Sequence, residues 1–179
     1  MHGLVSLLPS PYYERVEAIW DRLEQRCGLT GIRVTPYPHF SWQISEEYDF
    51  DRLEAAMQQV AARAKPFAVK TAGLGIFSGE NPVVYLLVAR NSRMAQLYNE
   101  IWQATSGLGT GVSEYYNDDN WAPHISLAYG DVDRQTLPEI LDELAFESFG
   151  WEFEVNNISL IVEPEGQIGQ LRWRVPFSG

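Results

Sequence analysis

A five-residue pattern, Pro-His-apolar-Ser-apolar, occurs twice in this chain, at residues 38–42 and again at residues 123–127. The two histidines of the pattern, His39 and His124, are separated by 124 − 39 = 85 residues. The chain has three histidines in total, so two of the three occupy the same position in the two copies. Self-similarity at a fixed offset is the sequence signature of repeated structure, and we interpret the pattern as an internal duplication.

Each copy alternates in the manner of a β-strand. Tyr37, His39 and Ser41 alternate with apolar residues in the first copy, and His124 and Ser126 do so in the second. Because successive side chains of a strand point to opposite faces, histidine and serine share one polar face, roughly 7 Å apart along the strand. The opposite face is apolar in both copies and is expected to pack in the core.

The elements around the two copies also repeat in order. In the first half we predict a strand at 3–8, a helix from Pro11 that ends at 28–31, the motif strand at 33–45, a helix capped by Asp49 and a strand at 66–76. A turn at 79–82 separates this half from a strand at 83–89, a helix capped by Asn91, the second motif strand, a helix at 134–145 begun by Asp133, and strands at 149–162 and 168–176.

This order predicts an α+β protein built from two strand-helix-strand-helix-strand units. We expect one domain, residues 1–179, with pseudo-repeats at about 1–78 and about 82–179. Two copies most simply close into a pseudo-twofold pair around a central groove. That arrangement would place His39 opposite His124 and Ser41 opposite Ser126.

Composition narrows the class of partner. A formal net charge of −11 argues against an extended grip on nucleic acid, which needs basic stripes, although a small anionic substrate can still bind one locally positive site. The lone Cys27 fits a reducing compartment, and the apolar stretch at 3–8 is too short and lacks the basic flank of a signal peptide. No stretch approaches membrane-spanning length. We therefore expect a cytoplasmic monomer that does not bind membranes.

The paired residues suit phosphoryl chemistry. Two imidazoles with ordinary pKa values of about 6.5 can divide general base and general acid work between them. Two hydroxyl groups beside them can donate hydrogen bonds to the non-bridging oxygens of a phosphate. For a phosphodiester, one histidine would remove a proton from water or a ribose hydroxyl while the other protonates the departing ribose oxygen.

The two His-x-Ser-apolar motifs, in a duplicated strand-helix frame, resemble those of the two-histidine (2H) phosphoesterase superfamily, which includes the 2′-5′ RNA ligase or LigT-like group and cyclic nucleotide phosphodiesterases. The resemblance covers nearly the whole chain. It implies a bilobal LigT-like fold, His39 and His124 as the acid/base pair, and Ser41 and Ser126 as phosphate ligands. The implied substrates are RNA 2′,3′-cyclic phosphate ends, cyclic nucleotides or 2′-5′ phosphodiester linkages, so the expected partner is a small nucleotide or an RNA end. The alternative is a catalytically inactive nucleotide- or RNA-binding module of the same fold.

Four further residues are candidate substrate contacts. Tyr37 lies on the polar face of the first motif strand, and Trp121 precedes the second motif, where it could stack on a base or pack in the core. Arg172 and Arg174 share a face of the last predicted strand, where they could clamp a phosphate or lie on an exposed sheet face.

We predict neither a metal ion nor a cofactor. The acidic residues of the loops, Glu46, Glu47, Glu114, Asp118 and Asp119, are interpreted as solvated side chains, and a zinc site based on the histidines lacks a third ligand. The glycine-rich stretch at 73–79 fails the dinucleotide-binding spacing, and we interpret it as relief for a crowded backbone.

Overall fold

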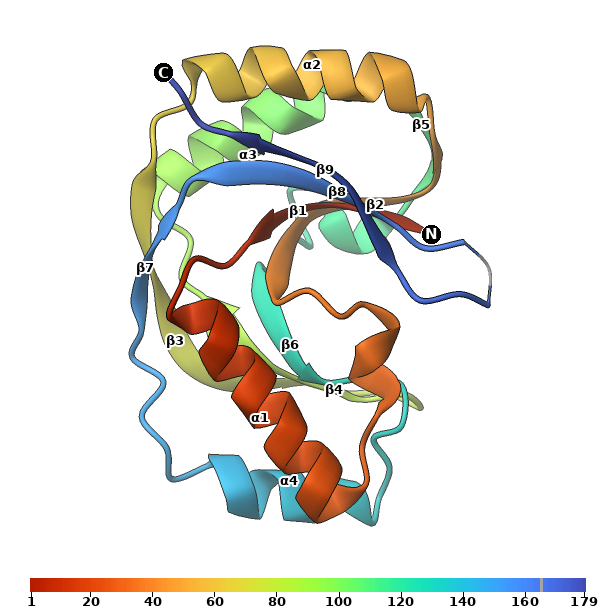
Figure 1. Ribbon diagram of the computed structural model, residues 1–179, viewed down its shortest axis with the longest axis vertical. Helices are drawn as coiled ribbons and strands as arrows, with labels where there is room; N and C mark the ends of the chain where they lie inside the picture. The colour runs from red at the N-terminus through yellow and green to blue at the C-terminus, as the bar shows by residue number, and fades with distance from the viewer. Residues whose placement is uncertain (165) are drawn as a thin grey trace.

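The computed structural model describes residues 1–164 and 166–179, which form nine strands and four α-helices (Figure 1). The strands are β1 (His2–Leu7), β2 (His39–Tyr48), β3 (Phe67–Phe77), β4 (Val83–Val88), β5 (Gly109–Val112), β6 (His124–Ala128), β7 (Glu152–Val155), β8 (Asn157–Val162) and β9 (Gln170–Pro176). The helices are α1 (Tyr12–Cys27), α2 (Phe50–Arg63), α3 (Ser92–Ala104) and α4 (Thr136–Leu144), and short 3₁₀ turns occur at Gly31–Val34 and Glu114–Tyr116.

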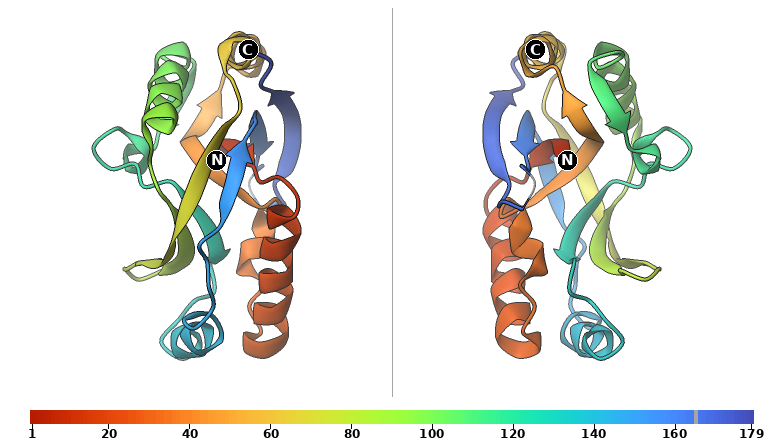
Figure 2. Two further views of the ribbon diagram at one scale, coloured as in Figure 1. Left: turned by 90° about the vertical axis from the view of Figure 1, so that its left-hand side faces the viewer. Right: turned by 90° about the vertical axis from the view of Figure 1, so that its right-hand side faces the viewer.

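The strands form two antiparallel sheets, in the orders β5-β2-β1-β8-β9 and β6-β4-β3-β7. Helices α2 and α3 pack together at one end of the molecule, and α1 and α4 pack together at the other (Figure 1). Seen from the sides, the two sheets curve past each other between these helix pairs (Figure 2). No helix among the residues that the structure describes is long and apolar enough to cross a membrane.

The predicted helix signals act where the sequence places them. The carboxylate of Asp49 accepts a hydrogen bond from the N–H of Arg52 (3.2 Å) and the amide oxygen of Asn91 accepts one from Met94 (2.9 Å), so each caps the helix that follows. Asp133 accepts from the N–H groups of Gln135 and Thr136 at the start of α4. Gly28 ends α1 in the left-handed conformation, with a φ of 71°.

The register of the two motif strands repeats. On β2, His39 pairs with Leu7 and Ser41 with Val5 of β1. On β6, His124 pairs with Leu87 and Ser126 with Tyr85 of β4. Each pair of strands also shifts register at one corresponding point, between Leu4 and Val5 in β1 and between Val84 and Tyr85 in β4. The two motifs therefore have equivalent neighbours in two different sheets.

The pairing of β3 with β7 relates the two halves to each other. Phe67 pairs with Val155 and Lys70 pairs with Glu152. The offset within these pairs is 155 − 70 = 152 − 67 = 85, the same as between the two histidines, so equivalent residues exchange partners as they do about a twofold axis. Beyond this pairing, β3 continues beside β4 of the second half, and β8 lies beside β1 of the first half. Each sheet thus contains strands from both halves of the chain.

Three predicted strands differ from the structure. The first motif strand begins at His39 rather than at residue 33, because Pro36 and Pro38 have no N–H to contribute to a ladder. The predicted strand at 149–162 is two strands, β7 and β8, which belong to different sheets. The glycine-rich exit of α3 forms the unpredicted strand β5, which pairs with the far end of β2.

His2 is not at a frayed terminus. It is 9% exposed within β1 and its ring lies edge-on to Phe50 of α2, with ring centroids 5.2 Å apart. The N-terminal strand is held between β2 and β8, which removes the freedom usual at a chain end.

Asn157 is the first residue of β8, where the chain passes from one sheet to the other, and it is fully buried. Its side chain accepts a hydrogen bond from the Leu7 N–H (3.0 Å) and donates one to the Leu7 carbonyl (2.9 Å). We expect Asn157→Ala to lower the free energy of unfolding by about 2–4 kcal/mol, because it leaves both groups buried without partners. Urea denaturation measures the change. The exposed Asn99→Ala on α3 is the matched control, and an equal loss in both variants would contradict this role.

Candidate active site

Both motif histidines are anchored to the backbone in the same way. Nδ1 of His39 is 2.5 Å from the carbonyl oxygen of Tyr37, and Nδ1 of His124 is 2.7 Å from the carbonyl oxygen of Ala122. A carbonyl only accepts, so the neutral ring must carry its proton on Nδ1 to make this bond. Nε2 of each ring then has a free lone pair, which suits a base in the neutral form and an acid in the protonated form.

The shared spacing of the two motifs explains this anchor. The accepting carbonyl lies two residues before each histidine, across the proline of the motif. The carbonyl of that proline also joins the neighbouring strand, since Pro38 accepts from the N–H of Leu8 (3.0 Å) and Pro123 accepts from the N–H of Val88 (2.9 Å). Proline fixes its own φ near −65° and disfavours helix before it, so the approach to each histidine is stiff.

Two indole groups tie the motif strands to segments outside their own sheets. Trp121 donates from Nε1 to the carbonyl of Ser41 (2.9 Å), and Trp20 of α1 donates to the carbonyl of Ser126 (3.1 Å). Strands β2 and β6 also contact each other directly. These buried links hold the two histidines near each other although they belong to different sheets.

Burial lowers the pKa of both histidines. The pKa of His39 falls from 6.5 to about 4, chiefly because burial disfavours the charged ring, with the charge of His124 lowering it further and the bond to Tyr37 opposing the fall. Burial also lowers the pKa of His124, against the effect of its bond to Ala122. Both imidazoles are therefore neutral at pH 7 in the unliganded protein. The charge effect also indicates that the two rings lie close together.

The two serines have different surroundings. Ser41 is 7% exposed, and its hydroxyl is hydrogen-bonded to the hydroxyl of Tyr116. Burial raises the pKa of Tyr116, so the phenol keeps a proton that it can donate to Ser41, leaving the serine proton free for another acceptor. Ser126 is more exposed.

Aromatic rings surround His124 but not His39. The His124 ring meets Phe77 edge-on, with centroids 4.8 Å apart, and lies tilted against Tyr85 at 5.2 Å. Sequence analysis missed both residues, because it treated 73–79 only as relaxed backbone. The signal was present: the predicted turn at 79–82 pairs β3 with β4, and Tyr85 is in register with Ser126.

Of the aromatic candidates, Trp121 is buried and Tyr37 is partly exposed. Trp121 is 3% exposed and its ring is stacked on Trp42 and on Tyr98, so the alternative that it stacks on a base is wrong and it belongs to the core. Tyr37 packs against the apolar cluster of Val5, Leu7 and Ile161, beside His39 on the first sheet.

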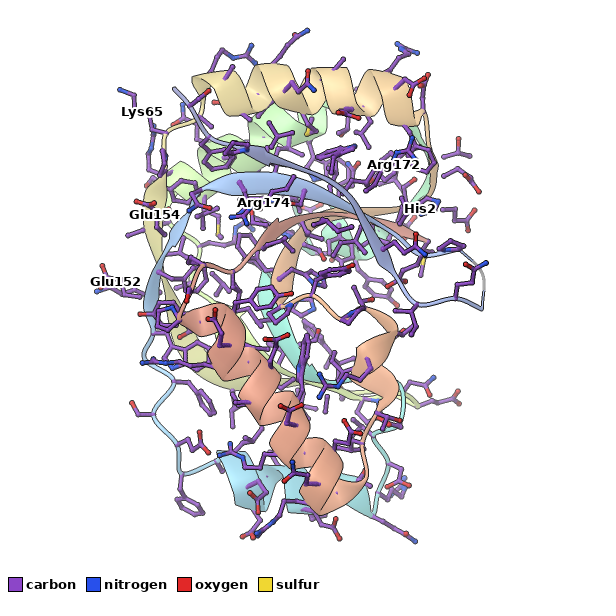
Figure 3. The ribbon with its side chains drawn as sticks, in the orientation of Figure 1. His2, Lys65, Glu152, Glu154, Arg172 and Arg174 are labelled. Carbon is purple, nitrogen blue, oxygen red and sulfur yellow. The ribbon has the colours of Figure 1, made fainter. Side chains whose placement is uncertain are left out.

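The two arginine candidates lie apart from the histidines. Both are on β9, three strands from β2 in the first sheet, which is about 14 Å at ~4.8 Å per strand (Figure 3). Arg172 lies over the ring of Phe50, 4.6 Å from its centroid. Arg174 lines a cavity with Glu154, Asn156 and Phe177. The structure thus contradicts the alternative of an arginine clamp, because these side chains pack elsewhere.

Within the described part of the chain, no group of three or more His, Cys, Asp and Glu side chains is arranged to hold a metal ion. The acidic loop residue Asp118 forms an ion pair with Arg90 instead (3.1 Å). A cavity of about 580 Å³ lies between the Gly31–Val34 turn and the β8–β9 connection, and none of its lining residues is a motif residue.

The arrangement defines a class of protein: a mixed α/β fold with two curled antiparallel sheets, each of which supplies one His-x-Ser strand. The family model of the 2′-5′ RNA ligase superfamily matches residues 8–167, so the chain belongs to this superfamily of 2H phosphoesterases. The resemblance inferred from the two motifs is confirmed.

Solved structures agree on the fold. The protein TT0787 of Thermus thermophilus superposes with a TM-score of 0.65 at 17% identity, covering 99% of this chain and 98% of that one. E. coli LigT complexed with 3′-AMP gives a TM-score of 0.56 at 18% identity, with coverage of 99% and 98%. At these identities the likeness establishes the LigT-like fold and no more. No curated protein matches this chain.

The depressed histidine pKa predicts an acid-sensitive fold. Between about pH 6.5 and pH 4 the unfolded chain binds more protons at His39 than the folded chain does, so the free energy of unfolding should fall as the pH falls through this window. Above it the contribution of His39 is constant. His39→Gln should weaken this slope in denaturation curves measured at several pH values, whereas Ser126→Ala, which removes no titrating group, should keep it. A variant slope equal to that of the wild type would contradict the assignment.

Proposed function

We propose that this protein is a metal-independent phosphoesterase that acts on RNA 2′,3′-cyclic phosphate ends, cyclic nucleotides or 2′-5′ phosphodiester linkages. The observation that carries the proposal is the matched anchoring of His39 and His124. Both rings bond a backbone carbonyl through Nδ1, which leaves two Nε2 atoms for proton transfer on adjacent strands. Membership of the 2′-5′ RNA ligase superfamily supports the same chemistry.

The proposed reaction on a 2′,3′-cyclic phosphate uses each imidazole once. One neutral ring takes a proton from water as the water oxygen attacks phosphorus. The bond from phosphorus to one ribose oxygen breaks, and the other ring, protonated at Nε2, gives its proton to that oxygen. The products are a phosphomonoester and a ribose hydroxyl, and the proton taken up by the first ring returns to the pair through solvent.

We assign His39 as the base and His124 as the acid in this direction. Burial and the charge of His124 together give His39 a pKa of about 4, so His39 is the ring that stays neutral when the pair holds one proton. The faces of Phe77 and Tyr85 beside His124 favour a cation there. Ser41, oriented by Tyr116, and Ser126 donate to the non-bridging oxygens of the phosphate in the proposed complex.

Replacing either histidine tests the assignment. His39→Ala and His124→Ala should each lower kcat by roughly 10²–10⁴ on a nucleoside 2′,3′-cyclic phosphate in the presence of a chelator, because each removes one proton transfer. The double variant should be hardly worse than either single variant, since the two rings act as a unit. Ser126→Ala should lose less, because proton transfer remains. Full activity in His39→Ala would overturn the paired mechanism, and saturable binding by a wild type without turnover would favour the inactive binding module.

The pH dependence gives a second test. Because one ring must be neutral and the other protonated, kcat/KM should follow a bell-shaped curve whose limbs report the coupled pair. A bound phosphate anion should raise the pKa of both rings, so the limbs of the kcat curve should lie at higher pH than those of kcat/KM. Chelators should leave both curves unchanged. Activity lost in chelator and restored by a divalent ion would contradict the metal-independent mechanism.

A further inference from the structure

We propose that Phe77 and Tyr85 form a nucleobase-binding platform beside His124, so that the nucleoside of the substrate lies over the second sheet. This inference rests on the proposed function and adds to it the side on which a base is recognised. The two rings are stacked with centroids 4.1 Å apart, and both remain partly exposed although they come from adjacent strands. They also contact the His124 ring, so a ligand on them is next to the reacting phosphate.

The backbone of β3 is adapted to this pair of rings. Gly75 is the register partner of Tyr85, and a Cβ added at Gly75 would lie 2.5 Å from the Tyr85 ring. Any other residue would push that ring off the strand. The glycine therefore lets Tyr85 lie flat against β3, where Phe77 stacks on it. This placement gives the glycine at position 75 a specific role in the site.

The first sheet has no equivalent platform. The counterpart of Tyr85 at the matching register position is Val5, which is 1% exposed, and the residue 85 positions after Phe77 is Val162. The apolar cluster beside His39 is aliphatic, made of Val5, Leu7 and Ile161 with Tyr37 and Leu171 packed against it. The pseudo-twofold repetition of the motifs is thus broken by aromatic residues on one side only.

The chemistry of the platform favours a neutral planar ligand. Every nucleobase offers a π-face, and stacking on aromatic side chains tolerates differences in base identity. The basic side chains Arg172 and Arg174 lie on β9 in the other sheet, so the platform itself supplies no positive charge. A ribose joins the phosphate to the base, and with the phosphate at the histidines the base falls on the neighbouring rings. The nucleoside would then present its departing oxygen to His124, the proposed acid.

Binding without turnover tests this platform separately from catalysis. Dissociation constants are measured by calorimetry for a nucleoside 3′-monophosphate and for ribose 3-phosphate, which lacks the base. The wild type should prefer the nucleotide. In Phe77→Leu and Tyr85→Leu this preference should fall by roughly 5- to 100-fold, the loss typical of one stacking contact, while the affinity for ribose 3-phosphate changes little. Phe77→Tyr keeps a ring and should keep the preference.

Three controls fix the interpretation. Leu171→Ala alters the apolar cluster of the first sheet and should leave the preference unchanged. A preference lost in Tyr37→Leu and kept in Phe77→Leu would overturn the proposal by placing the base over the first sheet. Equal losses for both ligands in the Phe77 and Tyr85 variants would also overturn it, because the rings would then act only by holding His124. A protein without turnover that retains the base-dependent preference keeps the platform and loses the proposed reaction, so the two failures are distinguishable.

Discussion

The antiparallel pairing of β3 with β7 is the constraint on which the rest of the structure depends. It joins equivalent segments of the two halves, Phe67 with Val155 and Lys70 with Glu152, about a pseudo-twofold axis. Because β3 then continues beside β4 while β8 begins beside β1, neither sheet can form from one half of the chain alone. The two motif strands are brought together by this exchange. A duplication that kept its halves as separate lobes would have to position the histidines through a mobile interface between domains.

The site uses backbone groups to achieve what a pair of flexible side chains cannot. A free histidine has two rotatable bonds and two tautomers, and proton transfer requires one combination of them. The carbonyls of Tyr37 and Ala122 select the tautomer and the ring orientation together. The strands are fixed in turn by the indoles of Trp121 and Trp20, which bond the carbonyls of Ser41 and Ser126. The buried tryptophans thus serve the site by holding its backbone.

The sequence predicts the parts of the site that depend on local periodicity. A period of two places His39 with Ser41 on one face, and the duplicated motif locates both strands and the helix caps that follow them. The burial of Trp121 between Trp42 and Tyr98, and the stacking of Arg172 on Phe50, depend on which helix packs on which sheet, and no local pattern encodes that. The division of residues 149–162 between two sheets is likewise a consequence of the exchange. Phe77 and Tyr85 fall between these cases, because their pairing follows from a turn that the sequence marks.

The electrostatics of the pair explain how two like groups take opposite roles. In the unliganded protein burial lowers the pKa of both rings, so the site holds two neutral imidazoles and no buried cation. A phosphate that enters brings the negative charge needed to stabilise one proton on the pair. Once one ring is protonated, its charge lowers the pKa of the other, as the effect of His124 on His39 indicates, and a second proton is disfavoured. In the proposed mechanism the substrate thereby creates the acid, and the proximity of the rings preserves the base. The difference between the two environments, aromatic around His124 and aliphatic around His39, then decides which ring keeps the proton.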